Sequence, residues 1–248
     1  MALPVMLLLA VVMTGTAFLS GIFGMAGGLV LVGVLLALLP LPEAMALHAV
    51  TQMASNGWRG LLWRRHVVWR PVLWVVAGYA LAMLAWSLVR WVPDKPLALI
   101  ALGGTPFLTQ LLPENLRPDP RRPAQGILYG AACMSLLLLT GVSGPLLDRF
   151  FLGGGLDRRQ IIATKAACQL AEHGMKLVYF SRLVDQAAGV EPLVAVMAVA
   201  CSMLGTTLAR RVLEAMSDAQ YRSWTGRLIA GISGSYLAYG GWLLMAAP

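Results

Sequence analysis

One stretch of the sequence carries five polar side chains within about four helical turns, between long apolar runs. The stretch reads TKAACQLAEHGMKLVYF, and its polar members are Lys165, Gln169, Glu172, His173 and Lys176. A charged side chain costs roughly 2.5–3.5 kcal/mol at the centre of a membrane helix, so this face is expected to line a bundle interior or a wet cavity. Amides and nearby positive charge could hold a small anion there. A histidine, with His173 favoured, could titrate between about pH 5 and 8 and couple protons to the anion.

A second stripe of the same kind begins at His48. The residues His48, Gln52 and Asn56 recur at every fourth position, as do Lys165, Gln169 and His173. Residues four apart share a helix face, so two such faces predict a substrate site between two helices. Two alternatives stay open: the polar groups could only bind neighbouring helices, and Lys165 could extend to the membrane surface. Glu172 and Lys176 are four residues apart and are interpreted as a structural pair in which the two opposite charges neutralise one another.

Two glycine-rich motifs stand where one apolar segment must give way to the next. They are GIFGMAGG, from Gly21 to Gly28, and GVSGP, from Gly141 to Pro145. Glycine tolerates the backbone of a broken helix, and the N–H groups at a helix N-terminus attract anions. Broken helices at matched places are typical of transport sites. The candidates are Gly21, Gly24, Gly27, Gly28, Gly141, Ser143 and Gly144, with Arg149 as a further source of positive charge. Close helix packing through small residues is the alternative.

The composition is that of an integral membrane protein. Of 248 residues 58% are hydrophobic and only 12% charged, and the mean hydropathy is +0.73. The first 42 residues carry no charge, about twice what one helix needs to cross roughly 30 Å of hydrocarbon. The start of the chain lacks the basic region of a signal peptide, so the first segment is expected to be retained.

Apolar runs bounded by proline, glycine and charge divide the chain into ten segments. They cover about residues 2–22, 24–40, 44–63, 70–91, 95–112, 125–142, 145–155, 160–181, 191–209 and 224–246. The second has 17 residues and the seventh 11. These two are therefore the expected broken or re-entrant pieces.

The basic residues predict the orientation. With the N-terminus outside, eleven arginines fall in inside loops and only Arg90, Lys95 and Arg182 fall outside. The net charge of +8 thus reflects topology, and no basic run lies in a soluble segment that could bind nucleic acid. The polar, proline-rich segment PENLRPDPRRP is the expected cytoplasmic connector, at residues 113–124, between membrane units at 1–112 and 125–248.

The two halves resemble one another. FLSGIFG matches LLTGVSG with an offset of 120 residues, and HAVTQMASNG matches KAACQLAEHG with an offset of 117. An odd number of crossings in each half would invert the second half relative to the first. The predicted fold is therefore an all-α, polytopic bundle of about 8–10 membrane segments, built from two inverted repeats with broken or re-entrant helices.

These residues together resemble the TauE/SafE-type sulfite exporter family of membrane transporters. LSGIFGMAGG is similar to the family's first glycine signature, WRRHVVWRPVLWVVAG to its arginine-rich inner loop and following helix, and TKAACQLAEHGMKLVYF to its second-half helix. The resemblance covers most of the chain. Two departures leave the substrate open: AGGLVLVG lacks the proline that often follows the signature, and Asp148 and Arg149 have no evident counterpart.

The resemblance implies a bacterial inner-membrane exporter of small sulfur-containing anions, such as sulfite or organosulfonates, linked to the proton motive force. Its partners would be a small anion, the lipid bilayer and protons; a homodimer is left open. No cofactor or metal is expected, because the cysteines Cys133, Cys168 and Cys201 lack metal-ligand spacing.

Two other classes of function remain as alternatives. Gly141 to Gly144 matches the G-x-S-G pattern of an intramembrane serine protease, with Ser143 as nucleophile and His173 as base. The matching motif at Gly21 to Gly24 has phenylalanine at the serine position, so the glycines are explained without catalysis. An anion channel is the second alternative, and saturable flux that responds to a proton gradient would argue against it.

Overall fold

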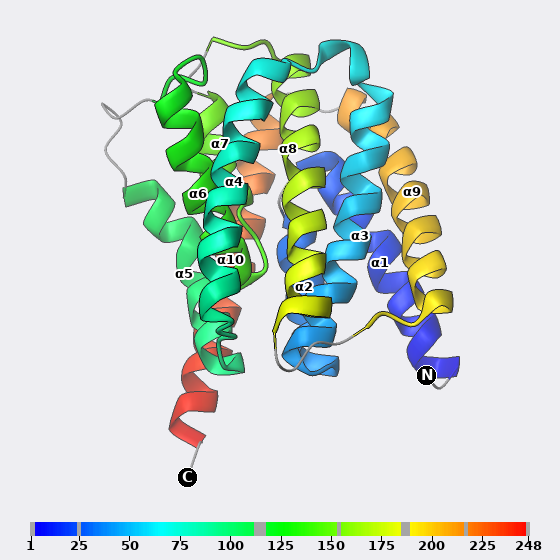
Figure 1. Cartoon of the computed structure of the whole chain (residues 1–248). Helices are drawn as coiled ribbons and strands as arrows, with labels where there is room; N and C mark the ends of the chain where they lie inside the picture. The colour runs from blue at the N-terminus through cyan, green and yellow to red at the C-terminus, as the bar shows by residue number, and fades with distance from the viewer. Residues whose placement is uncertain are drawn as a thin grey trace.

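The computed structural model describes residues 3–23, 26–111, 118–152, 155–184, 189–215 and 218–246. In these ranges the regular secondary structure is helical (Figure 1). The first five α-helices are α1 (Leu3–Phe23), α2 (Ala26–Leu38), α3 (Leu41–Leu62), α4 (Trp69–Val89) and α5 (Lys95–Leu111). The next five are α6 (Pro123–Thr140), α7 (Gly144–Leu152), α8 (Arg158–Val178), α9 (Pro192–Ala215) and α10 (Asp218–Ala246). A short 3-10 helix, η1 (Arg64–His66), precedes α4, and a π-helical turn, η2 (Tyr179–Leu183), ends α8.

Five helices are long and apolar enough to cross a membrane. These spans are Leu3–Phe23, Trp69–Val89, Pro123–Thr140, Pro192–Val212 and Arg227–Ala246. Their outer faces present large apolar side chains such as Leu73, Leu88 and Val196, which are 62%, 80% and 67% exposed. Exposed leucine and valine on this scale need lipid as their solvent. The prediction of an all-α polytopic membrane protein is confirmed.

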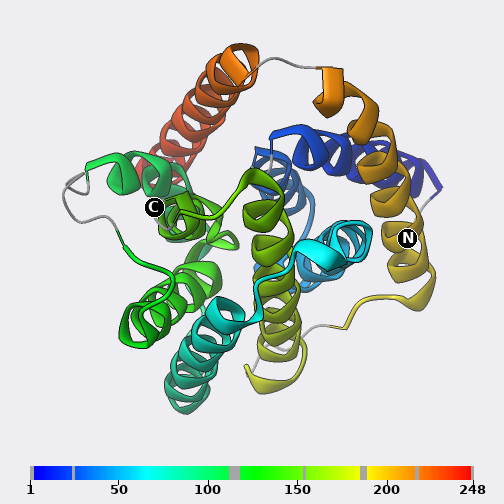
Figure 2. The same cartoon turned by 90° about the horizontal axis from the view of Figure 1, so that it is seen from above.

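The helices α3 and α8 are long but more polar, and they pack against one another along their length. Helix α9 also packs on α3, and α4 on α8. Viewed from above in Figure 2, α8 lies in the middle of the molecule with the other helices around it. The two polar stripes found in the sequence therefore belong to the two central helices, where protein rather than lipid surrounds them.

Two helices are too short to span. Helix α2 has 13 residues and α7 has 9, which correspond to roughly 20 Å and 14 Å at 1.5 Å per residue. In Figure 1, α1 starts and α2 ends near the lower edge, whereas α6 starts and α7 ends near the upper edge. Each short helix thus returns toward the side from which its partner came. We call the junction between α1 and α2 the first elbow, and the turn at 141–143 between α6 and α7 the second elbow.

The helix contacts have a regular pattern. Helix α1 packs on α9 as α6 packs on α4, and the pairs α3–α8 and α5–α10 are also extensive. Exchanging α1–α5 with α6–α10 in order maps α1–α9 onto α6–α4, and it maps α3–α8 and α5–α10 each onto itself. Small residues allow the closest approaches: a Cβ on Gly205 would overlap the Thr14 carbonyl oxygen, and one on Gly130 would overlap the Val75 carbonyl oxygen.

Arginines gather at one end of the bundle. The end of α3, the starts of α4, α6 and α8, and the end of α9 all lie toward the top of Figure 1. Exposed arginines at these places are Arg64, Arg65, Arg70, Arg121, Arg122, Arg159, Arg210 and Arg211. Arg90 and Arg182 lie at the opposite ends of their helices, beyond α4 and within η2.

Candidate functional site

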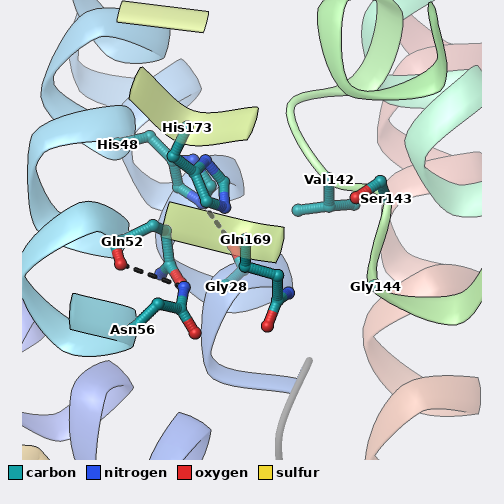
Figure 3. A pocket seen from close by; sticks show the side chains of 9 residues that line it. All are labelled: Gly28, His48, Gln52, Asn56, Val142, Ser143, Gly144, Gln169 and His173. Carbon is teal, nitrogen blue, oxygen red and sulfur yellow. Dashed lines mark hydrogen bonds between the residues drawn. The ribbon is translucent and has the colours of Figure 1, made fainter. Parts of the chain in front are cut away.

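A small pocket lies between the two central helices, the start of α2 and the second elbow. Its cavity volume is about 20 Å³. In Figure 3 the side chains of α3 and α8 occupy one side and the second elbow the other. The lining residues are Gly28, His48, Gln52, Asn56, Val142, Ser143, Gly144, Gln169 and His173.

His48 has partners on both ring nitrogens. Its Nε2 lies 3.1 Å from the Gly28 carbonyl oxygen, and its Nδ1 lies 2.9 Å from the Lys176 ammonium nitrogen. Since an ammonium group only donates, Nδ1 accepts, and Nε2–H donates to Gly28. His48 is therefore neutral in this arrangement and joins α3 to α2 and α8.

His173 stands beside His48 with an unused nitrogen. The two ring centroids are 5.5 Å apart in an edge-on contact. His173 is 3% exposed, and its Nδ1 has no hydrogen-bond partner among the residues that the structure describes. A buried polar atom without a partner is costly unless a ligand or water meets it. The pocket is therefore lined by a histidine with a buried nitrogen that no described protein group satisfies.

The second elbow depends on Gly141. It ends α6 with a φ of +88°, and its N–H donates to the Leu137 carbonyl oxygen over 2.8 Å. A Cβ at this position would lie 2.7 Å from a Val32 methyl group and 3.0 Å from the Met45 sulfur. The Ser143 carbonyl oxygen then accepts from the N–H groups of Leu146 and Leu147, which starts α7. The break predicted from GVSGP is present, and it directs the N-terminus of α7 at the pocket.

Two charged side chains of α8 hold this elbow. The Ser143 hydroxyl donates to Glu172 Oε1 over 2.6 Å, and Lys176 Nζ donates to the Gly141 carbonyl oxygen over 3.1 Å. Both Glu172 and Lys176 are 0% exposed. The predicted structural pair is therefore wrong in its geometry, because each side chain bonds the elbow instead of the other.

The amides of the pocket are largely free for a ligand. Asn56 Nδ2 donates to the Gln52 carbonyl oxygen over 2.9 Å, and Asn56 Oδ1 lies 3.4 Å from Arg59 Nη1. In the described part of the chain, the side-chain amides of Gln52 and Gln169 have no hydrogen bond to protein. The residues that carry these two amides and the unpartnered imidazole nitrogen, Gln52, Gln169 and His173, thus line the same small pocket.

Matched positions of the two halves make matched contacts. Arg59 Nη2 donates to the Ser20 carbonyl oxygen over 3.0 Å, just before the first elbow, as Lys176 does to Gly141 at the second. Arg59 and Lys176 are 117 residues apart, the offset found from the sequence. Likewise, His48 bonds Gly28 near the start of α2, and Lys165, at the position matching His48, pairs with Asp148 of α7.

The predicted site residues divide into two groups. Eight of them line the pocket: Gly28, His48, Gln52, Asn56, Ser143, Gly144, Gln169 and His173. Gly21 instead packs against Ala209, and Gly27 against Thr16 and Ser20. Gly141 shapes the elbow, Arg149 lies in α7 outside the lining, and Gly24 falls outside the described residues.

Lys165 does not reach the pocket. Its ammonium pairs with the Asp148 carboxylate, and the two side chains are only 13% and 23% exposed. This pairing also accounts for Asp148, which had no evident counterpart in the sequence. Lys165 therefore anchors α8 to α7 at this position.

Neutralising Lys165 is expected to affect stability more than anion binding. Lys165→Met should leave a mostly buried carboxylate without its partner and lower the free energy of unfolding by about 1–3 kcal/mol. Thermal unfolding in detergent measures this loss, and Asp148→Asn on the same background should restore part of it. If Lys165→Met had unchanged stability but no longer bound the anion, Lys165 would instead belong to the anion site.

Val142, Glu172 and Lys176 were not assigned to the site from the sequence. A signal existed for two of them: Gln169, Glu172, His173 and Lys176 have the spacing i, i+3, i+4 and i+7 of one helix face. The i,i+4 pairing rule for opposite charges favoured the wrong partner. Val142 carries no chemical signal, because it lines the pocket only through the break at Gly141.

The geometry does not favour a serine protease. Ser143 is 1% exposed, and its hydroxyl donates to a carboxylate rather than to a histidine. A nucleophilic serine needs a base within hydrogen-bond reach and an accessible carbonyl carbon.

In the ranges that the structure covers, no group of three or more histidine, cysteine or acidic residues is placed to hold a metal ion.

Comparison with known proteins gives one match. The family model described as Sulfite exporter TauE/SafE matches residues 7–237. No curated protein and no solved structure matches the chain.

Proposed function

The chain belongs to the sulfite exporter TauE/SafE family, and from this membership we propose that it is a secondary transporter of small sulfur-containing anions in a bacterial inner membrane. Sulfite and small organosulfonates are the proposed substrates, and export coupled to protons is the proposed direction. The observation that carries the proposal is the buried pocket between α3 and α8, which is lined by hydrogen-bond donors and contains an unpartnered His173 nitrogen.

The chemistry of the pocket suits an oxyanion. The amides of Gln52 and Gln169 supply neutral donors, and α7 begins at the pocket with Gly144. A helix N-terminus carries unsatisfied N–H groups and a partial positive charge. The Lys176 ammonium contacts His48 Nδ1 and adds a full positive charge close to the pocket. Sulfite presents three oxygens in a compact shape, which suits donors that converge on one small space.

The pocket size favours compact substrates. With a volume of about 20 Å³, the cavity holds little more than one water, so it must widen to admit any anion, and a compact anion requires the least widening. Sulfite and short organosulfonates are therefore better candidates than large anions. The same tight enclosure favours a carrier over a channel.

Alternating access is proposed to use the two halves as inverted repeats joined by a cytoplasmic connector at 113–124. Support comes from the exchangeable helix contacts and from the matched contacts of Arg59 and Lys176. In the proposed cycle the elbows open to one side at a time around the pocket. The arginine-rich end would face the cytoplasm.

The test is a flux assay with the purified protein in liposomes. Sulfite, sulfate, thiosulfate, sulfoacetate and small carboxylates are compared as substrates. The proposal expects saturable sulfite flux that responds to an imposed pH gradient. Flux without saturation would indicate a channel, and no flux of any sulfur anion would reject the proposed substrate class.

Removing one pocket amide is expected to weaken anion binding strongly. Gln169→Leu keeps the approximate volume but removes a donor to a charged ligand, worth about 1.5–3 kcal/mol, so the sulfite Kd should rise roughly tenfold to a hundredfold. Binding in detergent measures this change. Val178→Ala, on the exposed side of the same helix, is the matched control. Equal Kd values for Gln169→Leu and wild type would place the site elsewhere.

A further inference from the structure

The Ser143 hydroxyl has a single proton, and in this structure that proton is already used. Ser143 lines the pocket, yet its Oγ–H donates to Glu172 Oε1 over 2.6 Å. An ionised carboxylate can only accept, so it fixes the direction of this hydrogen bond. While Glu172 is ionised, Ser143 therefore presents lone pairs rather than a donor to the pocket, which repels an anion.

A proton on Glu172 reverses the hydrogen bond. The protonated carboxyl group has its own O–H, which can donate to Ser143 Oγ, and the serine hydroxyl hydrogen then turns toward the pocket. The same event removes one negative charge from beside the site. Both changes favour an anion, so proton binding and anion binding support each other.

The surroundings of Glu172 leave room for this proton. The side chain is 0% exposed, and its Oε2 has no hydrogen-bond partner in the described part of the chain. The Tyr79 hydroxyl of α4 lies near it without a well-formed hydrogen bond. The titratable and charged groups that face Glu172 are Tyr79 from α4, Cys133 from α6, and Lys165, Cys168 and Lys176 from α8.

The two histidines are less suited to this role. Both nitrogens of His48 already have partners. A proton on Nδ1 would make that nitrogen a donor facing the Lys176 ammonium, which is also a donor. His173 has a free nitrogen, but no hydrogen bond ties its protonation to another group of the pocket. Of these three groups, Glu172 alone is hydrogen-bonded to a pocket hydroxyl whose proton would have to turn toward an arriving anion.

We propose that Glu172 is the proton-binding residue of the transport cycle and that the Ser143 hydroxyl couples its proton to the bound anion. This inference rests on the proposed function as an anion transporter. One proton then enters with each anion from the side that the pocket faces. A sulfite dianion with one proton carries one net negative charge, so an inside-negative membrane potential drives it outward.

The experiment compares sulfite binding and proton movement in wild type, Glu172→Gln, Ser143→Ala and His173→Gln. Sulfite itself titrates, but this effect is common to all four proteins and cancels when Kd values are expressed relative to Glu172→Gln at the same pH. For wild type that ratio should rise about tenfold or more between about pH 5.5 and 8, since one linked proton changes affinity by up to tenfold per pH unit.

Each variant has a distinct expected result. Glu172→Gln can donate to Ser143 at every pH, so it should bind sulfite as tightly as wild type at low pH and more tightly than wild type at high pH, and its side chain should carry no proton with the anion. Ser143→Ala should bind more weakly and show a smaller pH effect. His173→Gln should keep the wild-type pH dependence whatever its affinity.

Three outcomes would overturn the assignment. The first is a pH-independent ratio between wild type and Glu172→Gln, and the second is proton-coupled flux that survives in Glu172→Gln. The third is loss of the pH effect in His173→Gln alone, which would move the proton to that ring. If Glu172→Gln does not fold, an undiminished pH effect in Ser143→Ala refutes the coupling. Absence of sulfite binding by the wild type would instead reject the proposed function.

Discussion

Replacing Gly141 with valine is expected to abolish sulfite transport and to destabilise the protein. The residue has a φ of +88°, and a Cβ would collide with Val32 and Met45. A β-branched residue in the left-handed region costs about 1–3 kcal/mol, and overpacking of a tight contact costs a similar amount. The elbow can relieve both only by moving Ser143 and the start of α7 away from the pocket.

Proteoliposome flux and thermal unfolding in detergent together measure this effect. The matched control is Gly104→Ala in α5, where a Cβ meets no atom within 4 Å; its stability should be unchanged or slightly higher. Gly141→Ala should lie between wild type and Gly141→Val, because it keeps the strain but adds less bulk. Wild-type flux by Gly141→Val would show that the elbow has no fixed conformation in transport.

Replacing Lys176 with methionine is expected to have the second large effect. The ammonium donates to His48 Nδ1 and to the Gly141 carbonyl oxygen, and it lies one turn from the buried Glu172. Its removal leaves three groups without compensation, and loss of one buried charge beside another costs on the order of 3–5 kcal/mol. Both the midpoint of thermal unfolding and the anion affinity should fall.

A double-variant cycle separates charge from packing in this prediction. If the damage is electrostatic, Glu172→Gln on the Lys176→Met background should recover a large part of the stability, since no buried charge is then left alone. Lys176→Arg tests the position in another way, because Arg59 already occupies the matching place in the first half. Full additivity of the two neutralising substitutions would mean that Glu172 and Lys176 do not sense one another.

The sequence predicted the helical membrane fold and most of the pocket lining. Hydropathy located the spans, because lipid contact demands apolar side chains over a whole helix length. The stripe of His48, Gln52 and Asn56 and its counterpart with Gln169 and His173 located the central helices, because polar groups must avoid lipid. GVSGP located the second elbow, because glycine tolerates the backbone of a broken helix.

The partners of the charged residues could not be predicted in the same way. Spacing along one helix says which side chains share a face, but not which element lies opposite that face. The Lys165–Asp148 pair joins two helices, and Glu172 and Lys176 bond an elbow whose position depends on one positive φ. Such contacts arise from tertiary packing, so a rule based on neighbours within a helix assigned the wrong partner.

The matched contacts of the two halves also have a consequence for the energies of the transport cycle. In the proposed alternating access, two identical halves would make the inward-facing and outward-facing conformations related by a two-fold rotation and equal in free energy, with no intrinsic preference for either. This chain breaks that degeneracy at one place in particular. The position 117 residues before Glu172 is Ser55, whose hydroxyl pairs with the Thr206 hydroxyl of α9 over 2.9 Å. Under the proposed alternating access, an acid on one side and a serine on the other would make the free-energy difference between the two conformations depend on pH, so that acidity alone would bias which face of the membrane an empty carrier opens to.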